Sequence, residues 1–110
     1  MNWLANPFNL PLAGVVDAAG DLTIRFGPPN NQAWEVSQVS LEMPNAPQGT
    51  TVELRYMNSF ISAPRSARKA TAGTDPPIYL QPGETMTVVW ANSTPNLPGA
   101  ILVVYRKGIY

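Results

Sequence analysis

The side chains of this 110-residue chain that could do chemistry are its seven acidic residues, its serines and one basic cluster. Cysteine and histidine are both absent, which excludes disulfides, thiol nucleophiles and the usual zinc or copper ligands. The most common general base near neutral pH is also missing, and no Gly-x-Ser-x-Gly motif accompanies the serines. The sequence therefore predicts a protein that is not an enzyme.

The acidic residues offer the only other route to catalysis or metal binding. Glycoside hydrolysis needs two facing carboxylates, and calcium binding needs several oxygen ligands close together. Most of the acids fall at outward strand positions or in turns, where a charge is solvated. They are Asp17, Asp21, Glu35, Glu42, Glu53, Asp75 and Glu84. We predict no catalytic residue, no cofactor and no metal site.

Arg65, Arg68 and Lys69 form the only concentration of one charge in the sequence. Such a cluster can contact phosphates or an acidic partner. However, the net charge of the chain is zero, and no aromatic residue interleaves with the cluster. A domain that binds nucleic acid usually has a clear basic excess. We therefore expect a solvated loop or a protein contact here, with nucleic acid as the disfavoured alternative.

The overall composition is that of one charge-poor domain. Hydrophobic residues make up 45% of the chain and charged residues 13%, about half the usual share. A neutral surface repels copies of itself weakly, which favours association, although a monomer with a polar uncharged surface is the alternative. The first twelve residues are apolar without a basic start, and no apolar run is long enough to span a membrane. We expect synthesis and folding in a cytoplasm.

Twelve prolines and eight glycines fall between short apolar runs, a spacing that favours many strands joined by turns. Apolar and polar residues alternate over positions 22–26, 34–43, 52–56 and 86–90, and short apolar segments near 15–16, 78–80 and 101–105 indicate further strands. The expected fold is all-β: a single small antiparallel β-sandwich, jelly-roll or immunoglobulin-like, with about seven to eight strands.

Three details of this pattern carry further expectations. The parity of the apolar residues changes near Ser37 and Gln38, which predicts a β-bulge or a crossing between sheets. The run 101–105 is apolar throughout, as in a strand that is covered on both faces or lies in a subunit contact. Trp34 and Trp90 have inward parity and belong to the core, whereas Trp3 is free to serve an interface.

Two segments do not fit the compact sandwich. Residues 1–12 are apolar without clean alternation and contain Pro7 and Pro11, which oppose a central strand. Either this segment lies over the chain's own sheet, or it is an extended arm that docks on a neighbour; we expect the arm, followed by a sandwich domain over residues 13–110. Residues 59–77 are small, polar and basic, and are expected to form a long functional or mobile loop.

Several short segments together resemble a known family. Residues 25–28 (RFGP) and 33–36 (AWEV) are similar to the opening of small β-sandwich modules in virion proteins of tailed bacteriophages, especially those of actinobacteria. Residues 77–84 (PIYLQPGE), running into 88–90 (VVW), look like a hairpin of these modules, and 98–100 (PGA) resembles their closing turn. The basic segment 59–76 and the N-terminal arm depart from the family pattern.

The resemblance implies a capsid-surface, tail or fibre-associated component of the virion, made in the bacterial cytoplasm, and no catalytic residues. Within that range we favour a capsid decoration or stabilising protein, with the major capsid protein or other virion proteins as partners and a homo-oligomer such as a trimer. In this interpretation Trp3, Leu4, Phe8 and Leu10 bury against a neighbouring subunit, while Arg65, Arg68 and Lys69 meet an acidic surface. The alternative function is a carbohydrate- or receptor-binding module of a phage tail or fibre, with Tyr79 and Tyr110 as outward aromatic residues.

Overall fold

The computed structural model describes residues 2–109, apart from the side chain of Asp75, and is all-β over that range. No helix in this range is long and apolar enough to cross a bilayer. The strands are β1 (Asn2–Trp3), β2 (Phe8–Val15), β3 (Leu22–Phe26), β4 (Gln32–Glu42), β5 (Thr51–Tyr56), β6 (Ser59–Ser62), β7 (Lys69–Leu80), β8 (Met86–Ala91) and β9 (Pro98–Ile109).

The strands pair as a nested hairpin that has been rolled up. At its tip β5 pairs with β6, and outward from there β4 pairs with β7, β3 with β8 and β2 with β9, all antiparallel. Two further pairings, β9 with β4 and β8 with β5, close the roll into two sheets of order β2–β9–β4–β7 and β3–β8–β5–β6. This connectivity is a jelly roll, so the predicted sandwich is confirmed and the immunoglobulin-like option is set aside.

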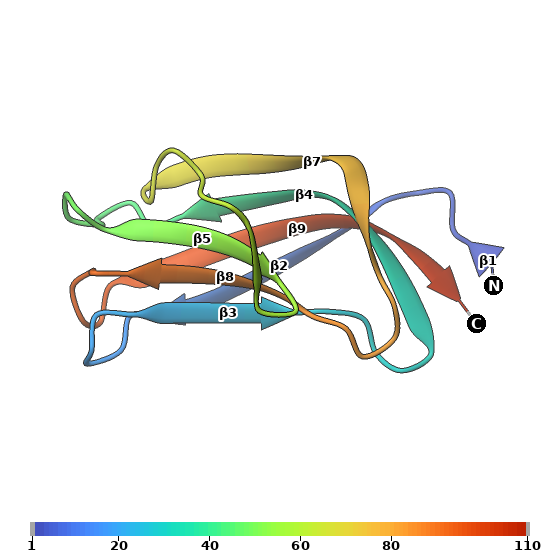
Figure 1. The fold of residues 1–110 in the computed structure, drawn as a ribbon, viewed down its shortest axis with the longest axis horizontal. Helices are drawn as coiled ribbons and strands as arrows, with labels where there is room; N and C mark the ends of the chain where they lie inside the picture. The colour runs from blue at the N-terminus through green and yellow to red at the C-terminus, as the bar shows by residue number, and fades with distance from the viewer. Residues whose placement is uncertain (1, 110) are drawn as a thin grey trace.

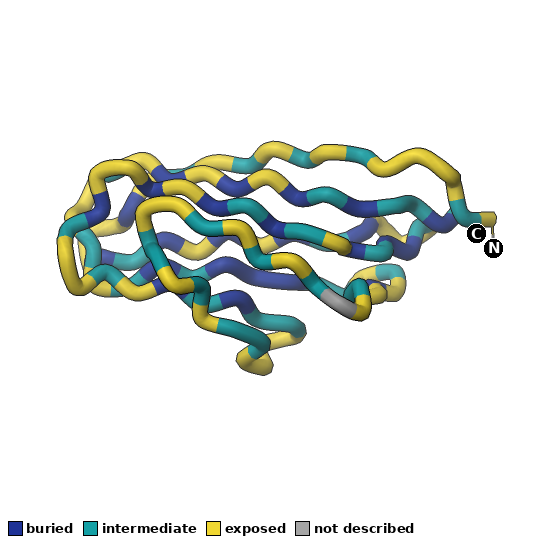
Figure 2. The backbone as a smooth tube through the Cα atoms, turned by 90° about the horizontal axis from the view of Figure 1, so that it is seen from above, coloured by how far each residue is buried: buried dark blue, intermediate teal, exposed yellow. Residues whose placement is uncertain are grey.

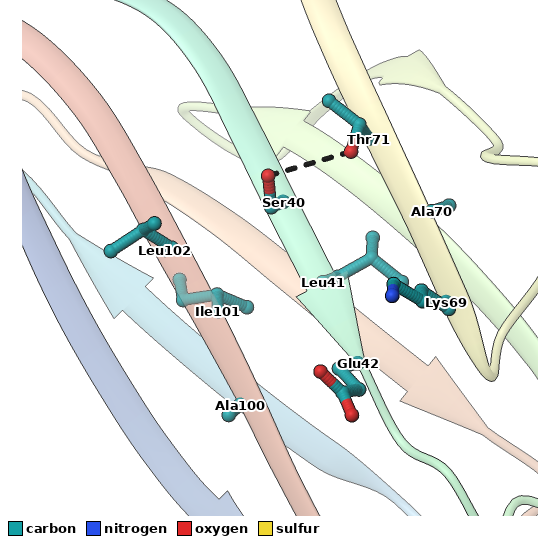
Figure 3. A pocket seen from close by; sticks show the side chains of 9 residues that line it. All are labelled: Ser40, Leu41, Glu42, Lys69, Ala70, Thr71, Ala100, Ile101 and Leu102. Atoms are coloured by element: carbon teal, nitrogen blue, oxygen red, sulfur yellow. Dashed lines mark hydrogen bonds between the residues drawn. The ribbon is translucent and has the colours of Figure 1, made fainter.

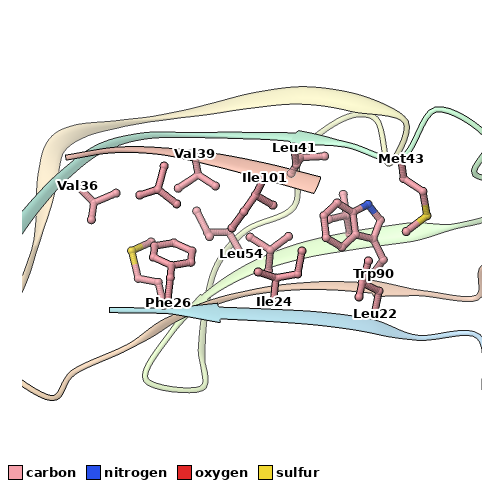
Figure 4. Packing of buried hydrophobic residues seen from close by; sticks show 14 of the residues in the cluster. Leu22, Ile24, Phe26, Val36, Val39, Leu41, Met43, Leu54, Trp90 and Ile101 are labelled. Atoms are coloured by element: carbon pink, nitrogen blue, oxygen red, sulfur yellow. The ribbon is translucent and has the colours of Figure 1, made fainter. Parts of the chain in front are cut away.

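The two sheets form the two layers seen in Figure 1, and their facing surfaces build one core. Burial alternates along the strands, as Figure 2 shows, because successive side chains point to opposite faces of a sheet. Figure 4 shows this packing, with Val39 and Ile101 from one sheet facing Ile24 and Leu54 from the other. Trp90 is fully buried, and its indole N–H donates to the Ala67 carbonyl at 3.0 Å. The predicted core positions of Trp34 and Trp90 are confirmed.

The parity change in β4 is a one-residue bulge at Ser37. Val36 faces Tyr105 of β9, but Gln38 faces Val104, so Ser37 is the extra residue. Its hydroxyl donates to the Val104 carbonyl at 3.3 Å, and on the other side of β4 the Thr74 hydroxyl donates to the Val36 carbonyl at 2.6 Å. The bulge keeps apolar side chains directed inward on both sides of residue 37, as the sequence predicts.

The expectation of a long loop over residues 59–77 is wrong. The chain turns at Met57 and Asn58, both with positive φ, which is the two-residue turn whose twist suits a hairpin. It then forms β6 and most of β7. Ala70 and Ala72 face the core from β7, and such small side chains give a weak alternating signal in the sequence.

The connection between β6 and β7 is anchored rather than mobile. Besides the bond from Trp90 to the Ala67 carbonyl, the Met43 amide donates to the Arg68 carbonyl at 2.8 Å. The side chain of Arg68 donates in turn from Nε to the Ala46 carbonyl at 2.8 Å. These bonds satisfy backbone groups at the edge of the core and fix the loop against the segment that follows β4.

The division into an arm over residues 1–12 and a domain over 13–110 also needs correction. Strand β2 runs without a break through residue 12 and pairs with β9 from Phe8, opposite Tyr105, to Val15, opposite Pro98. Pro7 precedes this strand and Pro11 lies within it, at a sheet edge where a missing N–H is tolerated. The segment thus lies on the chain's own sheet, and β1 continues along the same edge of β9.

The turn over residues 81–84 joins three parts of the sandwich. Gly83 has a φ of 83° after Pro82, the arrangement of a type II turn. The carboxylate of Glu84 accepts from the Gln81 amide at 2.6 Å and from the Tyr56 hydroxyl at 2.6 Å. Because of these bonds the pKa of Glu84 is lowered, first by Tyr56 and then by the Gln81 amide. Gly27 lies so close to this turn that a Cβ there would overlap the Glu84 carbonyl oxygen.

The substitution Gly27→Ala tests this close approach. The added methyl meets backbone rather than a flexible side chain, so we expect a loss of about 1–3 kcal/mol of unfolding free energy. Urea denaturation measures it. Gly73→Ala is the matched control, since a Cβ at Gly73 meets nothing within 4 Å. Equal stability of the two variants would contradict this packing.

The substitution Tyr56→Phe tests the hydrogen bond to Glu84. A lowered pKa of Glu84 means that the bond stabilises the fold above the ordinary glutamate pKa, about 4.3, and that this stabilisation is lost as the pH falls through the lowered value. We expect the variant to unfold at a lower midpoint temperature than the wild type at pH 7, and the difference between the two midpoints to disappear in acid. A gap that stays constant down to pH 2 would refute the assignment.

Candidate functional site

The outer face of the β2–β9–β4–β7 sheet carries an unusually apolar stripe. Outward positions on β2 and β9 face each other in four successive pairs, and all of these side chains except Asn9 are apolar. Among its large aliphatic residues, Val15 is exposed at 60% of its full accessible area and Leu102 at 36%. We call this the apolar stripe: Pro11, Ala13, Val15, Pro98, Ala100, Leu102 and Val104. Contiguous exposed apolar surface of this kind marks interaction sites.

The stripe is hollowed where its side chains are smallest. A hollow of about 220 Å³ lies over Ser40–Glu42 of β4, with Ala100 and Leu102 of β9 on one side and Lys69 of β7 on the other. Figure 3 shows these residues together with the contact between Ser40 and Thr71, whose hydroxyl oxygens lie 3.5 Å apart. A second, mostly apolar hollow continues past Ala13. The site thus combines apolar side chains of β9 with polar side chains of β4 and β7.

Farther along the same face, four side chains from four strands form an aromatic–ion-pair cluster: Trp3, Glu35, Tyr79 and Arg106. The rings of Trp3 and Tyr79 meet edge to face, with centroids 5.9 Å apart and an interplanar angle of 76°. Arg106 Nη2 donates to Glu35 Oε2 at 2.7 Å, and the guanidinium carbon lies 5.8 Å from the Trp3 ring centroid. The bond to Glu35 and its negative charge raise the pKa of Arg106.

The four apolar residues predicted for an interface separate into two pairs. Trp3 belongs to the aromatic–ion-pair cluster, and Leu4 is exposed. Phe8 and Leu10 point inward and pack against the core, and Phe8 stacks on Tyr105 with ring centroids 5.8 Å apart. These two side chains are therefore part of the domain's own core and do not form the docking surface of an arm.

The basic residues do not act as one cluster. The guanidinium of Arg68 is bonded to the Ala46 carbonyl, which gives this residue a structural role. Lys69 borders the hollow on the outer face of the sheet, directly across from Glu42. Arg65 is exposed in the connection between β6 and β7. Of the three, Lys69 alone lies beside the apolar stripe.

The acidic side chains that the structure describes do not gather into a group of three or more that could hold a metal ion. Two of them pair with arginine instead, Glu35 with Arg106 and Glu53 with Arg55. The side chain of Asp75 in β7 and the whole of Tyr110 lie outside the described residues. The outer face presents apolar, aromatic and hydrogen-bonding side chains.

Comparison with known proteins adds little to this description. No protein-family model matches the chain, and no curated protein resembles it. A structural similarity is found to the crystal structure of dimeric latent PorU from Porphyromonas gingivalis, with a TM-score of 0.45 and 12% sequence identity. The similarity covers 94% of this chain and 13% of that one, so the chain spans a small part of the PorU length.

Sequence reasoning identified part of this face and missed the rest. The continuous apolar run 101–105 gave the signal for the outer row of β9, and Tyr79 had outward parity. Glu35 and Arg106 gave no signal, because they are cross-strand neighbours only through the pairing of β4 with β9, which brings together residues 71 positions apart.

Two truncations distinguish the contribution of the edge strand β2 to stability from that of the segment before it. Removing residues 1–12 deletes more than half of β2 and removes Phe8, Leu10 and Leu12, which pack against the core. Each of these apolar side chains contributes at most about 1.5–3 kcal/mol to the free energy of unfolding, so we expect a total loss of several kcal/mol. Such a loss is comparable to the whole stability of a small domain, so the truncated chain should show no cooperative unfolding transition above room temperature. Removing residues 1–5 leaves β2 intact and should shift the midpoint by only a few degrees. Cooperative folding of the chain without residues 1–12 would instead support the prediction that these residues form an arm separate from the domain.

Proposed function

We propose that the chain is a structural component of a tailed-bacteriophage virion, a decoration or stabilising protein that attaches to the capsid through its apolar stripe. The observation that carries this proposal is the stripe itself, because an apolar row on the solvent side of a sheet is a liability unless another protein covers it. The jelly roll is a fold that viral shells use, although a fold alone does not assign a function.

The partner proposed is the major capsid protein or another virion protein, presented in many copies. A small rigid sandwich suits this work because weak contacts add up when they are repeated over a symmetric shell. Lys69 and Glu42 at the border of the hollow offer one charge of each sign, which would fix the register of the docked subunit rather than supply most of the affinity. A homo-oligomer on the capsid surface, such as a trimer, belongs to the same proposal.

The first requirement of this proposal is that the chain is present in particles. Mass spectrometry of gradient-purified particles of the phage that encodes it should detect the chain at a fixed ratio to the major capsid protein. Its absence from purified particles would refute the virion role, whatever the purified chain does alone.

The substitution Leu102→Glu tests the stripe as the contact. A carboxylate at this position must lose water when the stripe is covered, so we expect binding to particles that lack the chain to fall by at least about tenfold. Co-sedimentation with quantitative immunoblotting measures it. Thr23→Glu is the matched control, because Thr23 is exposed on a strand of the other sheet. Wild-type binding by Leu102→Glu, or an equal loss in Thr23→Glu, would contradict the proposed contact.

A further inference from the structure

The aromatic–ion-pair cluster is distinct from the apolar stripe. It lies around Arg106 of β9, whereas the hollow lies around Ala100 of the same strand. Successive residues of a strand advance by about 3.3 Å, so six residues separate the two by roughly 20 Å along the sheet. A contact that covers the hollow therefore need not cover the cluster, and the two can be occupied at once.

We propose that the aromatic–ion-pair cluster is a carbohydrate-binding site that takes a neutral sugar ring on the face of Tyr79. This inference goes beyond attachment to a shell and does not depend on it. The Tyr79 side chain is one of the most exposed aromatic residues of the described chain, at 53% of its full accessible area. Its ring offers the flat apolar surface on which the C–H face of a sugar can stack.

The hydroxyl groups around a sugar ring need both donors and acceptors, and the cluster supplies both. The ion pair uses Nη2 of Arg106 and Oε2 of Glu35. A guanidinium carries five N–H donors and a carboxylate two acceptor oxygens, so the pair retains bonding capacity on the solvent side. Because the two charges neutralise each other, the site has no preference for a charged ligand. A neutral sugar therefore fits it better than a phosphate or an acidic peptide.

The geometry of the cluster is set before any ligand arrives. Arg106 is held between its bond to Glu35 and the ring of Trp3, and the edge-to-face contact with Trp3 fixes the plane of Tyr79. Glu35 pairs across strands with both Tyr79 and Arg106, so these three positions are held by the sheet itself. Such preorganisation reduces the ordering cost of binding, which matters most for a small, weakly bound ligand.

A proline-rich peptide is the other ligand class that docks on exposed aromatic residues, and the structure favours it less. Polyproline segments bind in grooves lined by several aromatic rings. Here one ring is broadly exposed beside an ion pair, and the hollows of the outer face are lined by residues outside the cluster. A polyproline peptide is therefore included in the test as the competing outcome.

Trp3 makes the site observable. It is the partly exposed member of the three tryptophans, since Trp34 and Trp90 are buried. Acrylamide quenching of tryptophan fluorescence should therefore report mainly on Trp3, and a ligand on the cluster should reduce the quenching in a saturable way. The probes are tetrasaccharides of glucose, galactose, N-acetylglucosamine and rhamnose, each titrated to about 10 mM, a range suited to weak binding. We expect saturable protection by at least one of them.

Substitutions decide whether the protection comes from the cluster. For the sugar that binds, Tyr79→Ala should weaken binding by at least about tenfold, while Tyr79→Phe retains it because the ring is kept. Phe60→Ala is the matched control, since Phe60 is a more exposed aromatic residue on the other sheet. Should Tyr79→Ala fail to fold, Arg106→Lys tests the same site, because it keeps the charge and loses the planar donor fork.

Three results would overturn the proposal. The first is no protection of Trp3 by any of the four tetrasaccharides. The second is a loss of binding in Phe60→Ala as large as in Tyr79→Ala, which would mean non-specific adsorption to aromatic surface. The third is protection by a proline decamer with none by sugars, which would make the cluster a peptide site.

Discussion

The two apolar rows on β9 are the constraint from which the rest of the structure follows. Its inner row, including Ile101 and Val103, packs into the core between the sheets. Its outer row, including Leu102 and Val104, lies on the open face of its sheet. Both edges of β9 are also occupied, by β4 on one side and by β1 and β2 on the other. The strand that organises the fold therefore also supplies the surface on which a partner can bind.

Much of the fold could be predicted because it depends on local patterns. Alternating apolar residues located β3, β5 and β8, and the change of parity at Ser37 located the bulge in β4. Prolines and glycines between the apolar runs marked the corners, among them the turn at Pro82 and Gly83. The choice between a jelly roll and an immunoglobulin-like sandwich could not be made in this way, because it depends on which distant strands pair.

The features that were not predicted from the sequence also have physical explanations. Met57 and Asn58 form a hairpin turn without the glycine that usually marks one. The sequence pattern therefore did not predict β6. Prolines made β2 look like a free arm, although a sheet edge tolerates them. The members of the aromatic–ion-pair cluster come from strands that are adjacent in space and distant in sequence, so only Tyr79 and Trp3 could be singled out, and neither could be linked to Glu35 or Arg106.

Hydroxyl-radical footprinting of the chain, free and bound to purified particles, measures most directly whether the outer face of β9 is where a partner binds. We expect Leu102 and Pro11 to lose reactivity in the bound state, whereas Met57 and Phe60, exposed in the β5–β6 hairpin of the other sheet, keep theirs. Unchanged reactivity of Leu102, with protection at Met57 and Phe60 instead, would place the contact on the opposite side of the sandwich and contradict binding at β9.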